Sequence, residues 1–236
     1  MKISVIIPCY NFEKNILKNI SLLENELQKE FEEYELIIIN DGSNDKTQQE
    51  LEKINNNKTI ILKNDSNIGK SYSISKGLKI ATGEKLFLYD CDLPYFDYIK
   101  IFLKSLKINK FVIIDRKNKK SLLKKEKTNL YQKIRYFIGI FITHVVCFFL
   151  KIETIDTQSG MKGFDNIDTL KDKKFVSKRF FLDIEIIDYL KKKGIYPIKI
   201  PVEFIIPNNS TIKLLDIKNI FIILELIKVI LSIKKK

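Results

Sequence analysis

The sequence contains little cysteine and histidine. Among its 236 residues there are three cysteines and one histidine. The cysteines, Cys9, Cys91 and Cys147, are odd in number and have no paired spacing, which argues against a disulfide framework and against a zinc site. The lone His144 cannot by itself form a metal cluster. We therefore expect a chain kept in a reducing cytoplasm.

The sequence also lacks an uninterrupted apolar run of membrane-spanning length. The N-terminal run Ile3–Ile7 ends at Pro8, so we expect no signal peptide. Tyr136–Leu150 is nearly continuous in apolar residues but falls short of the roughly 20 residues that span a bilayer. Ile212–Ile233 carries five charged residues, and its spacing predicts a very apolar amphipathic helix. Such a helix packs in a core or lies in a membrane interface, and the pattern leaves both open.

Positive charge is abundant and unevenly placed. The formal net charge is +13. Between Lys100 and Arg135 there are 13 basic residues against Asp115 and Glu126, so this segment carries +11. The excess is explained either by solvated lysines or by a surface for an anionic partner. We expect no nucleic-acid partner, because no nucleic-acid motif or interleaving of aromatic and basic residues accompanies the charge.

Strand and helix patterns alternate through the first half of the chain, which predicts an α/β fold with a mainly parallel sheet flanked by helices. We expect strands at 3–7, 35–39, 59–62, 85–89 and 111–114, and helices at 15–31, 45–54, 71–81 and 95–107. The second half is less regular. There we expect a mobile loop at 116–129, a loop at 154–164, a helix at 182–193 and extended pieces at 197–206.

An Asp-x-Asp pair, Asp90 and Asp92, follows the predicted strand at 85–89. Two carboxylates at a strand end project to one side and supply the oxygen ligands that a divalent cation prefers. A cation there would neutralise a pyrophosphate leaving group. Two aspartates in a turn are also common without any metal, so the pair gains meaning only from its neighbours.

Polar clusters at 9–11 and 40–45 lie, like this pair, where ligands of parallel sheets bind, at the carboxyl ends of the strands. The segment Asn40–Thr47 offers Asp41 as an acceptor for a base N–H, and Gly42 allows a close approach. The segment Asn67–Lys70 opens a helix, where a glycine, a lysine and free amides favour phosphate. The alternative for each is an ordinary turn or helix cap.

In order and spacing these segments resemble the family 2 nucleotide-sugar glycosyltransferases of GT-A fold. The resemblance rests on 4–11, 40–47, 67–70, 77–83 and 90–92. Later segments resemble the dolichyl-phosphate glucosyltransferases and the polyprenyl-phosphate sugar synthases; they are Asp156–Phe164, Phe181–Glu185 and Ile200–Phe204. We expect a GT-A domain over residues 1–206, with a nucleotide-sugar half at 1–115 and an acceptor half at 116–206. Residues 207–236 would form the amphipathic helix and a basic tail.

The resemblance also implies roles for individual residues. The base would be held by Pro8, Tyr10 and Asp41, with Asn11, Gly42, Gly69 and Lys70 beside the nucleotide. Asp90 and Asp92 would bind Mg²⁺ or Mn²⁺ on its diphosphate. The acceptor would contact Arg116, Arg135, Gln158, Ser159 and Lys162.

Three functions fit this pattern. The first is inverting transfer of a hexose from a nucleotide diphosphate sugar, such as UDP-glucose or GDP-mannose, to a polyprenyl phosphate. It would take place on the anionic inner face of the membrane, and the acceptor needs no strong base because its second pKa is about 6. The second is transfer to a saccharide hydroxyl, which needs a carboxylate base, Asp183 or Glu185. The two carboxylates would otherwise simply favour a helix start. The third is a non-catalytic membrane-surface protein, against which the intact Asp-x-Asp argues.

Overall fold

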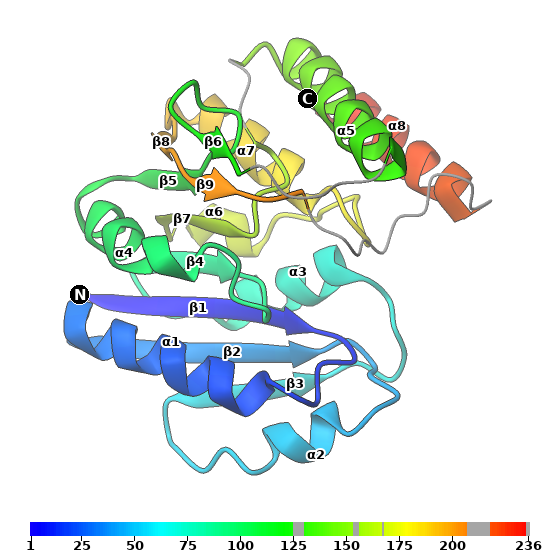
Figure 1. Cartoon of the computed structure of the whole chain (residues 1–236). Coiled ribbons are helices and arrows are strands. Elements are labelled where there is room, and N and C mark those ends of the chain that lie inside the picture. The colour runs from blue at the N-terminus through cyan, green and yellow to red at the C-terminus, as the bar shows by residue number, and fades with distance from the viewer. Residues whose placement is uncertain (125–129, 153–155, 167, 207–217, 235–236) are drawn as a thin grey trace.

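A mixed sheet forms the centre of the molecule (Figure 1). The computed structural model describes residues 1–124, 130–152, 156–166, 168–206 and 218–234. Among these residues, seven strands pair in the order β3-β2-β1-β4-β7-β5-β8. Their bounds are β1 Lys2–Cys9, β2 Glu33–Asn40, β3 Thr59–Lys63, β4 Lys85–Tyr89, β5 Phe111–Ile114, β7 Met161–Asp165 and β8 Ile198–Ile200. The predicted strands of the first half are therefore confirmed to within two residues at each end.

Strand β7 differs from its neighbours, because it runs antiparallel to both β4 and β5. The prediction of a loop over 154–164 is therefore wrong for the residues that form β7. Lys162 and Gly163 interrupt the apolar pattern of this strand, although both are buried in the sheet centre. Since β7 comes from the predicted acceptor half and lies between two strands of the predicted nucleotide-sugar half, the two halves share one sheet.

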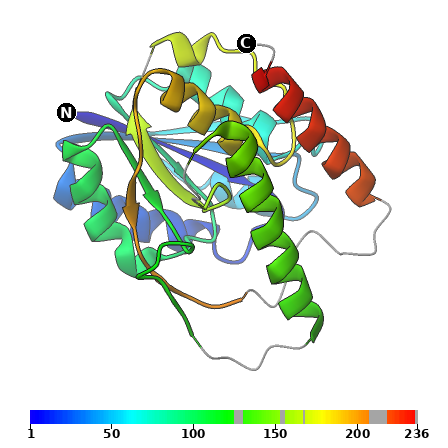
Figure 2. The same cartoon turned by 90° about the horizontal axis from the view of Figure 1, so that it is seen from above.

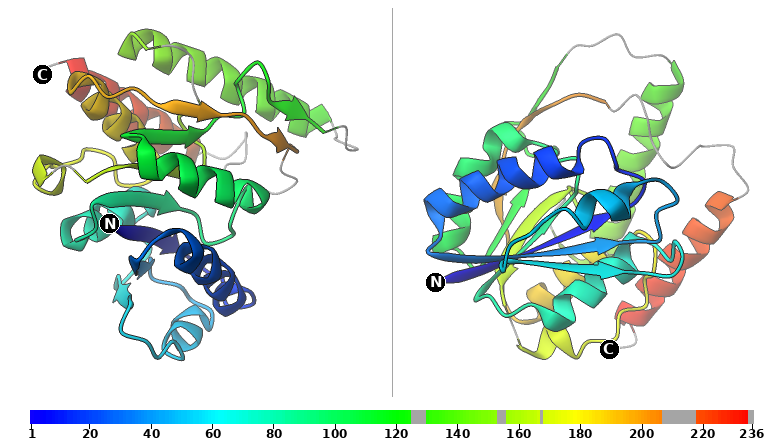
Figure 3. Two further views of the ribbon diagram at one scale, coloured as in Figure 1. Left: turned by 90° about the vertical axis from the view of Figure 1, so that its left-hand side faces the viewer. Right: turned by 90° about the horizontal axis from the view of Figure 1, so that it is seen from below.

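Helices cover both faces of the sheet (Figures 1 and 3). Alternate residues of β1 point to opposite faces: Val5 packs in the core with helices α1 and α4, and Ile6 packs with α3 and α7. The helix bounds are α1 Ile16–Glu30, α2 Thr47–Leu51, α3 Lys70–Ile80, α4 Ile99–Ile108, α6 Asp168–Lys171 and α7 Leu182–Lys192, with a 3₁₀ turn, η1, at Phe96–Tyr98. This layered core places the carboxyl ends of β1, β2 and β4 at one edge.

Two further helices, α5 (Leu130–Leu150) and α8 (Lys218–Lys234), pack against each other outside α7 (Figure 2). Val146 of α5, Val229 of α8 and Ile184 of α7 belong to one apolar cluster. The ammonium of Lys234 lies 4.3 Å from the ring centre of Phe149, which joins the helices near their ends. The sequence predicts an apolar segment and an amphipathic helix here, and residues 212–217 of that prediction lie outside the described residues.

A short two-stranded sheet pairs β6 (Leu122–Leu123) with β9 (Glu203–Phe204) in parallel. Backbone bonds from Leu122 to Val202 and from Lys124 to Phe204 extend this contact. The segment 116–129 was expected to be a mobile loop, and that expectation is wrong for the part that forms β6. Residues 125–129 lie outside the described residues.

Candidate active site

The loops that follow β1 and β2 are bonded to each other at the carboxyl edge of the sheet. The backbone N–H of Asn11 donates to Oγ of Ser43 at 2.9 Å, and that of Asn44 donates to Oδ1 of Asn11 at the same distance. Asn11 has a φ of 50°, a left-handed conformation that asparagine tolerates better than most residues. Pro8 is buried at the end of β1, and the Tyr10 side chain is exposed beside this joint. The predicted base-binding residues Pro8 and Tyr10 therefore lie where hydrogen bonds between the two loops hold the edge of the sheet.

Asp41 is buried and joins this edge to the segment that precedes α3. Its carboxylate accepts hydrogen bonds from Nδ2 of Asn64 at 2.8 Å, from N of Ile68 at 3.2 Å and from N of Gly69 at 2.9 Å. A carboxylate has about four acceptor sites, so these contacts leave about one for a nucleotide base. The first role of Asp41 in this structure is to hold the segment that leads to Lys70.

Gly42 is required by a close approach of the chain to itself. Its φ is 67°, and a Cβ added there would lie 2.3 Å from the carbonyl carbon of Ser66. Any other residue would therefore clash with backbone as well as strain its own conformation. The sequence suggested that this glycine lets a ligand approach, whereas the structure shows that it lets the 66–67 backbone approach.

The N-terminus of α3 is occupied by a loop from the second half of the chain. The amides of Ser71 and Tyr72 donate to the carbonyl oxygens of Arg179 and Lys178, at 3.1 and 2.9 Å. A Cβ on Gly69, whose φ is 129°, would lie 2.6 Å from the Lys178 oxygen. The expectation that these helix amides are free for phosphate is therefore wrong. The side chain of Lys70 is about a third exposed at this position.

Lys70 connects the start of α3 to the Asp-x-Asp pair. Its ammonium lies 2.5 Å from Oδ1 of Asp90. Burial lowers the pKa of Lys70, but the charges of Asp90, Asp183 and Asp92 outweigh burial and raise it. Burial, followed by the charge of Asp90, raises the pKa of the Asp92 carboxyl. The two carboxylates thus repel each other, and a cation between them would relieve that repulsion.

This donor set fits a divalent cation of the kind that the family implies. In the part of the chain that the structure describes, no third carboxylate, cysteine or histidine joins Asp90 and Asp92 in a metal-binding group. Mg²⁺ is commonly bound by one or two carboxylates together with substrate phosphates and water. A Cβ on Gly160, the residue before β7, would lie 2.7 Å from Oδ2 of Asp90, so a glycine there leaves room for that carboxylate.

A buried ion pair lies next to this group. Nζ of Lys162 on β7 is 3.1 Å from Oδ1 of Asp183, in the first turn of α7, and it also donates to the carbonyl oxygen of Ser159. Both side chains are more than nine-tenths buried. Burial lowers the pKa of Lys162, Asp183 opposes that effect, and the charge of Lys70 adds to it. Two predicted site residues, Lys162 and Asp183, are therefore paired with each other.

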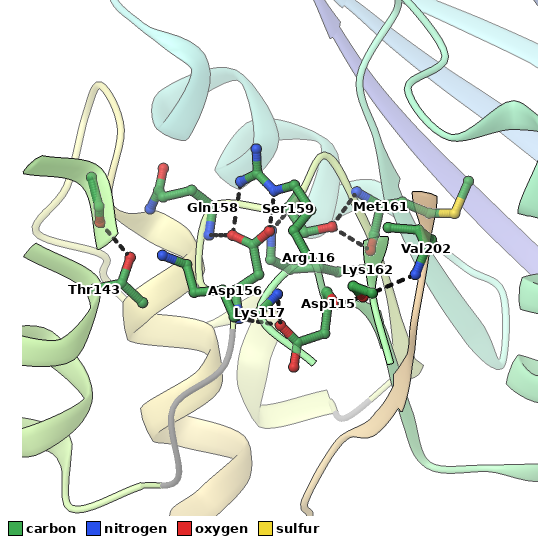
Figure 4. A network of polar contacts seen from close by, with 12 residues as sticks. Asp115, Arg116, Lys117, Thr143, Asp156, Gln158, Ser159, Met161, Lys162 and Val202 are labelled. Atoms are coloured by element: carbon green, nitrogen blue, oxygen red, sulfur yellow. Dashed lines mark hydrogen bonds and ion pairs between the residues drawn. The ribbon is translucent and has the colours of Figure 1, made fainter. Parts of the chain in front are cut away.

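Three of the remaining predicted acceptor residues, Arg116, Gln158 and Ser159, lie close to Asp156 (Figure 4). Arg116, two residues after the end of β5, makes two hydrogen bonds to this buried carboxylate, one of them at 2.9 Å. Burial raises the pKa of Asp156, but Arg116 lowers it by more. The pKa of this carboxyl is therefore below its usual value. Ser159 is buried, whereas Gln158 is exposed. The backbone of Arg135 lies in α5, and its side chain is outside the description.

Lys117 is a further cation at this place, which sequence reasoning missed (Figure 4). Its ammonium makes no ion pair with any described residue, although its backbone N–H donates to Oδ1 of Asp115. Burial lowers the pKa of Lys117, Asp156 opposes that effect and Arg116 adds to it. In the sequence it was one lysine in a basic segment, and no local signal distinguished it from its neighbours.

Glu185 anchors a loop. Its carboxylate oxygens accept hydrogen bonds from the backbone N–H groups of Val176 and Ser177, at 2.8 to 3.1 Å. Of the two candidate bases, Asp183 lies beside Lys162 and raises the pKa of Lys70, whereas Glu185 is committed to backbone amides. The geometry therefore favours Asp183 over Glu185 for any contact with the site.

The residues so assembled form one row of alternating charge, which runs from Asp90 through Lys70, Asp183, Lys162 and Asp156 to Arg116. It brings together residues predicted for the metal, the nucleotide and the acceptor. Asp156 was not among the candidates, although it begins the segment Asp156–Phe164 that carries part of the family resemblance.

This chain belongs to glycosyl transferase family 2, because residues 4–156, more than half of its length, match the profile of that family. The recognition made from the sequence is thereby confirmed. The family is one of glycosyltransferases.

Two curated relatives are similar over part of their lengths. The dolichol-phosphate mannosyltransferase of Pyrococcus furiosus is 30% identical over 96 residues, which are 40% of this chain and 27% of that protein. The poly-beta-1,6-N-acetyl-D-glucosamine synthase of Staphylococcus aureus is 32% identical over 140 residues, which are 56% of this chain and 33% of that protein. The chain thus matches a third or less of the length of either relative.

The fold is shared with the glucosyl-3-phosphoglycerate synthase of Mycobacterium tuberculosis, solved with Mn²⁺, UDP and glucosyl-3-phosphoglycerate. The TM-score is 0.64, with 98% of this chain and 79% of that chain covered, at 16% identity. The predicted fold class, an α/β GT-A fold with a mainly parallel sheet flanked by helices, is confirmed.

Proposed function

We propose that this glycosyltransferase moves a hexose, with inversion, from a nucleotide diphosphate sugar to a polyprenyl phosphate on the cytoplasmic face of a membrane. The observation that carries the proposal is the apolar outer surface of the paired helices α5 and α8. The exposed large apolar residues of this surface are Leu130, Tyr131, Ile134, Phe137, Ile138, Phe141, Ile142, Phe148 and Phe149 on α5, and Ile220, Phe221, Ile223, Leu224, Ile227 and Leu231 on α8. We call these residues the outer apolar face.

Helix α8 exposes several large apolar side chains as well as Lys228. Glu225 points inward and accepts hydrogen bonds from the protein, whereas Phe221, on the outer side, is 66% exposed. A helix on a water-facing surface shows the opposite arrangement. Helix α5 has 21 residues and begins before the apolar run expected at 136–150. By length and composition it could cross a bilayer, so the expectation that this segment is too short is wrong. Because Val146 and Leu150 pack it on the core, we propose that it lies in the interface beside α8.

The acceptor chemistry favours a lipid phosphate over a sugar hydroxyl. A phosphate monoester is a nucleophilic dianion near neutral pH and needs no proton removed. A hydroxyl needs a general base. Asp183 is ion-paired to Lys162, and Glu185 holds backbone amides, so neither of the two predicted bases has a free carboxylate.

For the donor, we propose that Pro8, Tyr10 and Asn11 border the base with Asp41, and that Lys70 contacts the diphosphate beside Gly42 and Gly69. Asp90 and Asp92 would hold Mg²⁺ or Mn²⁺, which supplies neutralisation of the diphosphate leaving group. UDP and Mn²⁺ accompany the solved Mycobacterium tuberculosis synthase, which supports a donor of this kind. Lys70 adds positive charge at the diphosphate and favours departure of the nucleotide.

For the acceptor, we propose that its phosphate lies at the end of the charged row nearest Arg116. Arg116 and Lys117 supply the cations there, with Gln158, Ser159 and Lys162 lining the approach. The backbone of Arg135 places it on α5, so the acceptor would reach this point along the outer apolar face. The basic segment at 100–135 would also attract an anionic leaflet.

Transfer to a saccharide hydroxyl is the second candidate, because the Staphylococcus aureus relative is named a polysaccharide synthase and Asp183 lies at the site. The experiment that separates the two offers the purified protein Mn²⁺, UDP- and GDP-hexoses, and either polyprenyl phosphate or a saccharide. We expect product only with the lipid. A saccharide product alone would overturn the proposal, and no product with any donor and acceptor would favour the non-catalytic alternative.

A further inference from the structure

We propose that Glu225 on α8 is a positioning residue for the donor site, and that it acts through the loop 177–179. Oε1 of Glu225 accepts hydrogen bonds from N of Lys178 at 2.6 Å, from N of Arg179 at 2.8 Å and from Oγ of Ser177 at 2.8 Å. These contacts join segments about 46 positions apart in the sequence. A single side chain of α8 therefore holds two successive backbone amides and a hydroxyl of this loop.

The same loop holds the start of α3. The carbonyl oxygens of Lys178 and Arg179 accept from the first amides of the helix, those of Tyr72 and Ser71. Oγ of Ser177 also lies 3.0 Å from Oγ of Ser71. The peptide groups of the loop are thus bonded on one side to Glu225 and on the other side to the helix that begins at Lys70. A loss of Glu225 would release the loop and, with it, the backbone that places Lys70.

The position of Gly69 makes this linkage tight. The Arg179 Cα and the Lys178 oxygen lie so close to Gly69 that a Cβ there would be 2.8 and 2.6 Å from them. A shift of the loop would therefore move Gly69 or open a gap beside it. Lys70, the next residue, pairs with Asp90 at 2.5 Å. Because α8 is the helix that we propose lies on the membrane, the helix that binds the lipid surface also sets the position of the donor-site lysine.

Glu225 is not needed as a salt-bridge partner in this arrangement. Its second oxygen, Oε2, is buried and has no hydrogen-bond partner among the described residues. All three bonds go to Oε1, and an amide oxygen accepts hydrogen bonds as a carboxylate oxygen does. The linkage thus predicts that Glu225→Gln retains the function of the residue and that Glu225→Ala loses it. A role that depends on the negative charge would make both variants fail.

The experiment compares the full chain with its Glu225→Gln, Glu225→Ala and Ser232→Ala variants. Ser232 is the matched control, because its hydroxyl on the same helix bonds only to Val229 of α8 among the described residues. The first readout is hydrogen exchange at the amides of Lys178, Arg179, Ser71 and Tyr72. We expect faster exchange at all four in Glu225→Ala alone, since exchange reports local opening. Unchanged exchange at Ser71 and Tyr72 would overturn the inference.

The second readout, which rests on the proposed function, is the Kd for UDP and for GDP with Mn²⁺. We expect Glu225→Ala to weaken nucleotide binding about tenfold, the equivalent of about 1.4 kcal/mol, with Glu225→Gln and Ser232→Ala near the parent value. If the parent chain binds neither nucleotide, the proposed function fails and the exchange data alone decide the linkage. If Glu225→Ala does not fold, Ser177→Ala replaces it, and unchanged exchange at Ser71 in that variant contradicts the inference.

Discussion

The ammonium of Lys70 lies 2.5 Å from Oδ1 of Asp90 and joins the first residue of α3 to the residue that follows β4. Both side chains are about a third exposed, so the pair lies at the surface of the carboxyl edge. The surrounding carboxylates keep the pKa of Lys70 raised in spite of burial, so it stays a cation at neutral pH. A diphosphate bound here would thus meet Lys70 and the Asp-x-Asp pair together.

Asp92→Asn tests the role of the second carboxylate of the Asp-x-Asp pair. Burial and the neighbouring Asp90 raise its pKa, so its charge is unfavourable in the folded chain. We expect transfer to fall by about a hundredfold or more, because charge stabilisation of the leaving group is lost. The melting temperature should stay the same or rise. Asp97→Asn, on an exposed residue, is the control and should change neither. Full activity of Asp92→Asn would remove the metal assignment.

Lys117→Ala tests the acceptor end of the charged row. We expect the KM for polyprenyl phosphate to rise about tenfold, which corresponds to about 1.4 kcal/mol of lost binding, while the Kd for the nucleotide stays the same. Burial lowers the pKa of Lys117, so its side chain loses its charge at a lower pH than an ordinary lysine does. Acceptor binding should therefore begin to weaken at that lower pH. Lys119→Ala, on an exposed neighbour, is the control. Equal KM values for both variants would place the phosphate elsewhere.

Glu35 offers a test of the fold that is independent of the site. This buried carboxylate accepts from Oγ of Ser4, from N and Oγ1 of Thr82 and from Nζ of Lys2. Burial raises its pKa, but these hydrogen bonds lower it below the ordinary value of 4.5. Its contribution is therefore present above pH 4.5 and is lost as the pH falls through the lower folded value.

The corresponding variant is Glu35→Gln. We expect it to lower the free energy of unfolding by about 1 to 3 kcal/mol at pH 7, measured by urea titration. The difference from the parent chain should shrink as the pH falls below 4.5. Glu33→Gln, on an exposed residue of the same strand, should show no such trend. A difference in the free energy of unfolding that persists at low pH would mean that the charge of Glu35 does not stabilise the fold.

The position of the candidate site could be predicted from the sequence, but several of the contacts within it could not. Each polar cluster after β1, β2 and β4 could be predicted, because strand alternation and the Asp-x-Asp pair are local signals. The amides of Ser71 and Tyr72 were expected to be free, because nothing local indicates the carbonyl groups of Lys178 and Arg179 that occupy them.

Strand β7 was missed for a similar reason. Lys162 reads as a solvated loop residue until Asp183, 21 positions away, is known to neutralise it in the core. The direction of Glu225 could not be predicted either. An amphipathic pattern identifies a polar stripe, but only tertiary contacts show that this glutamate points toward the protein.

The outer apolar face can be tested by flotation with vesicles of phosphatidylglycerol and phosphatidylcholine. Phe141→Glu and Phe221→Glu place a charge on α5 and α8, where the parent side chains are 69% and 66% exposed. We expect each to reduce vesicle binding several-fold at unchanged melting temperature, because burial of apolar area drives interfacial binding. Ile108→Glu, on α4 and 83% exposed, is the matched control and should bind as the parent does. Equal flotation of all four proteins would contradict membrane contact by α5 and α8.

The most direct measurement of the central claim is one reaction that holds both acceptors. Vesicles carrying polyprenyl phosphate and a soluble oligosaccharide are offered together with Mn²⁺ and a labelled UDP- or GDP-hexose, and the label is counted in the organic and aqueous phases. We predict that the label enters the organic phase as a phosphate-linked sugar, and that Asp92→Asn abolishes this transfer. Label found on the oligosaccharide, with none in the lipid, would contradict the account.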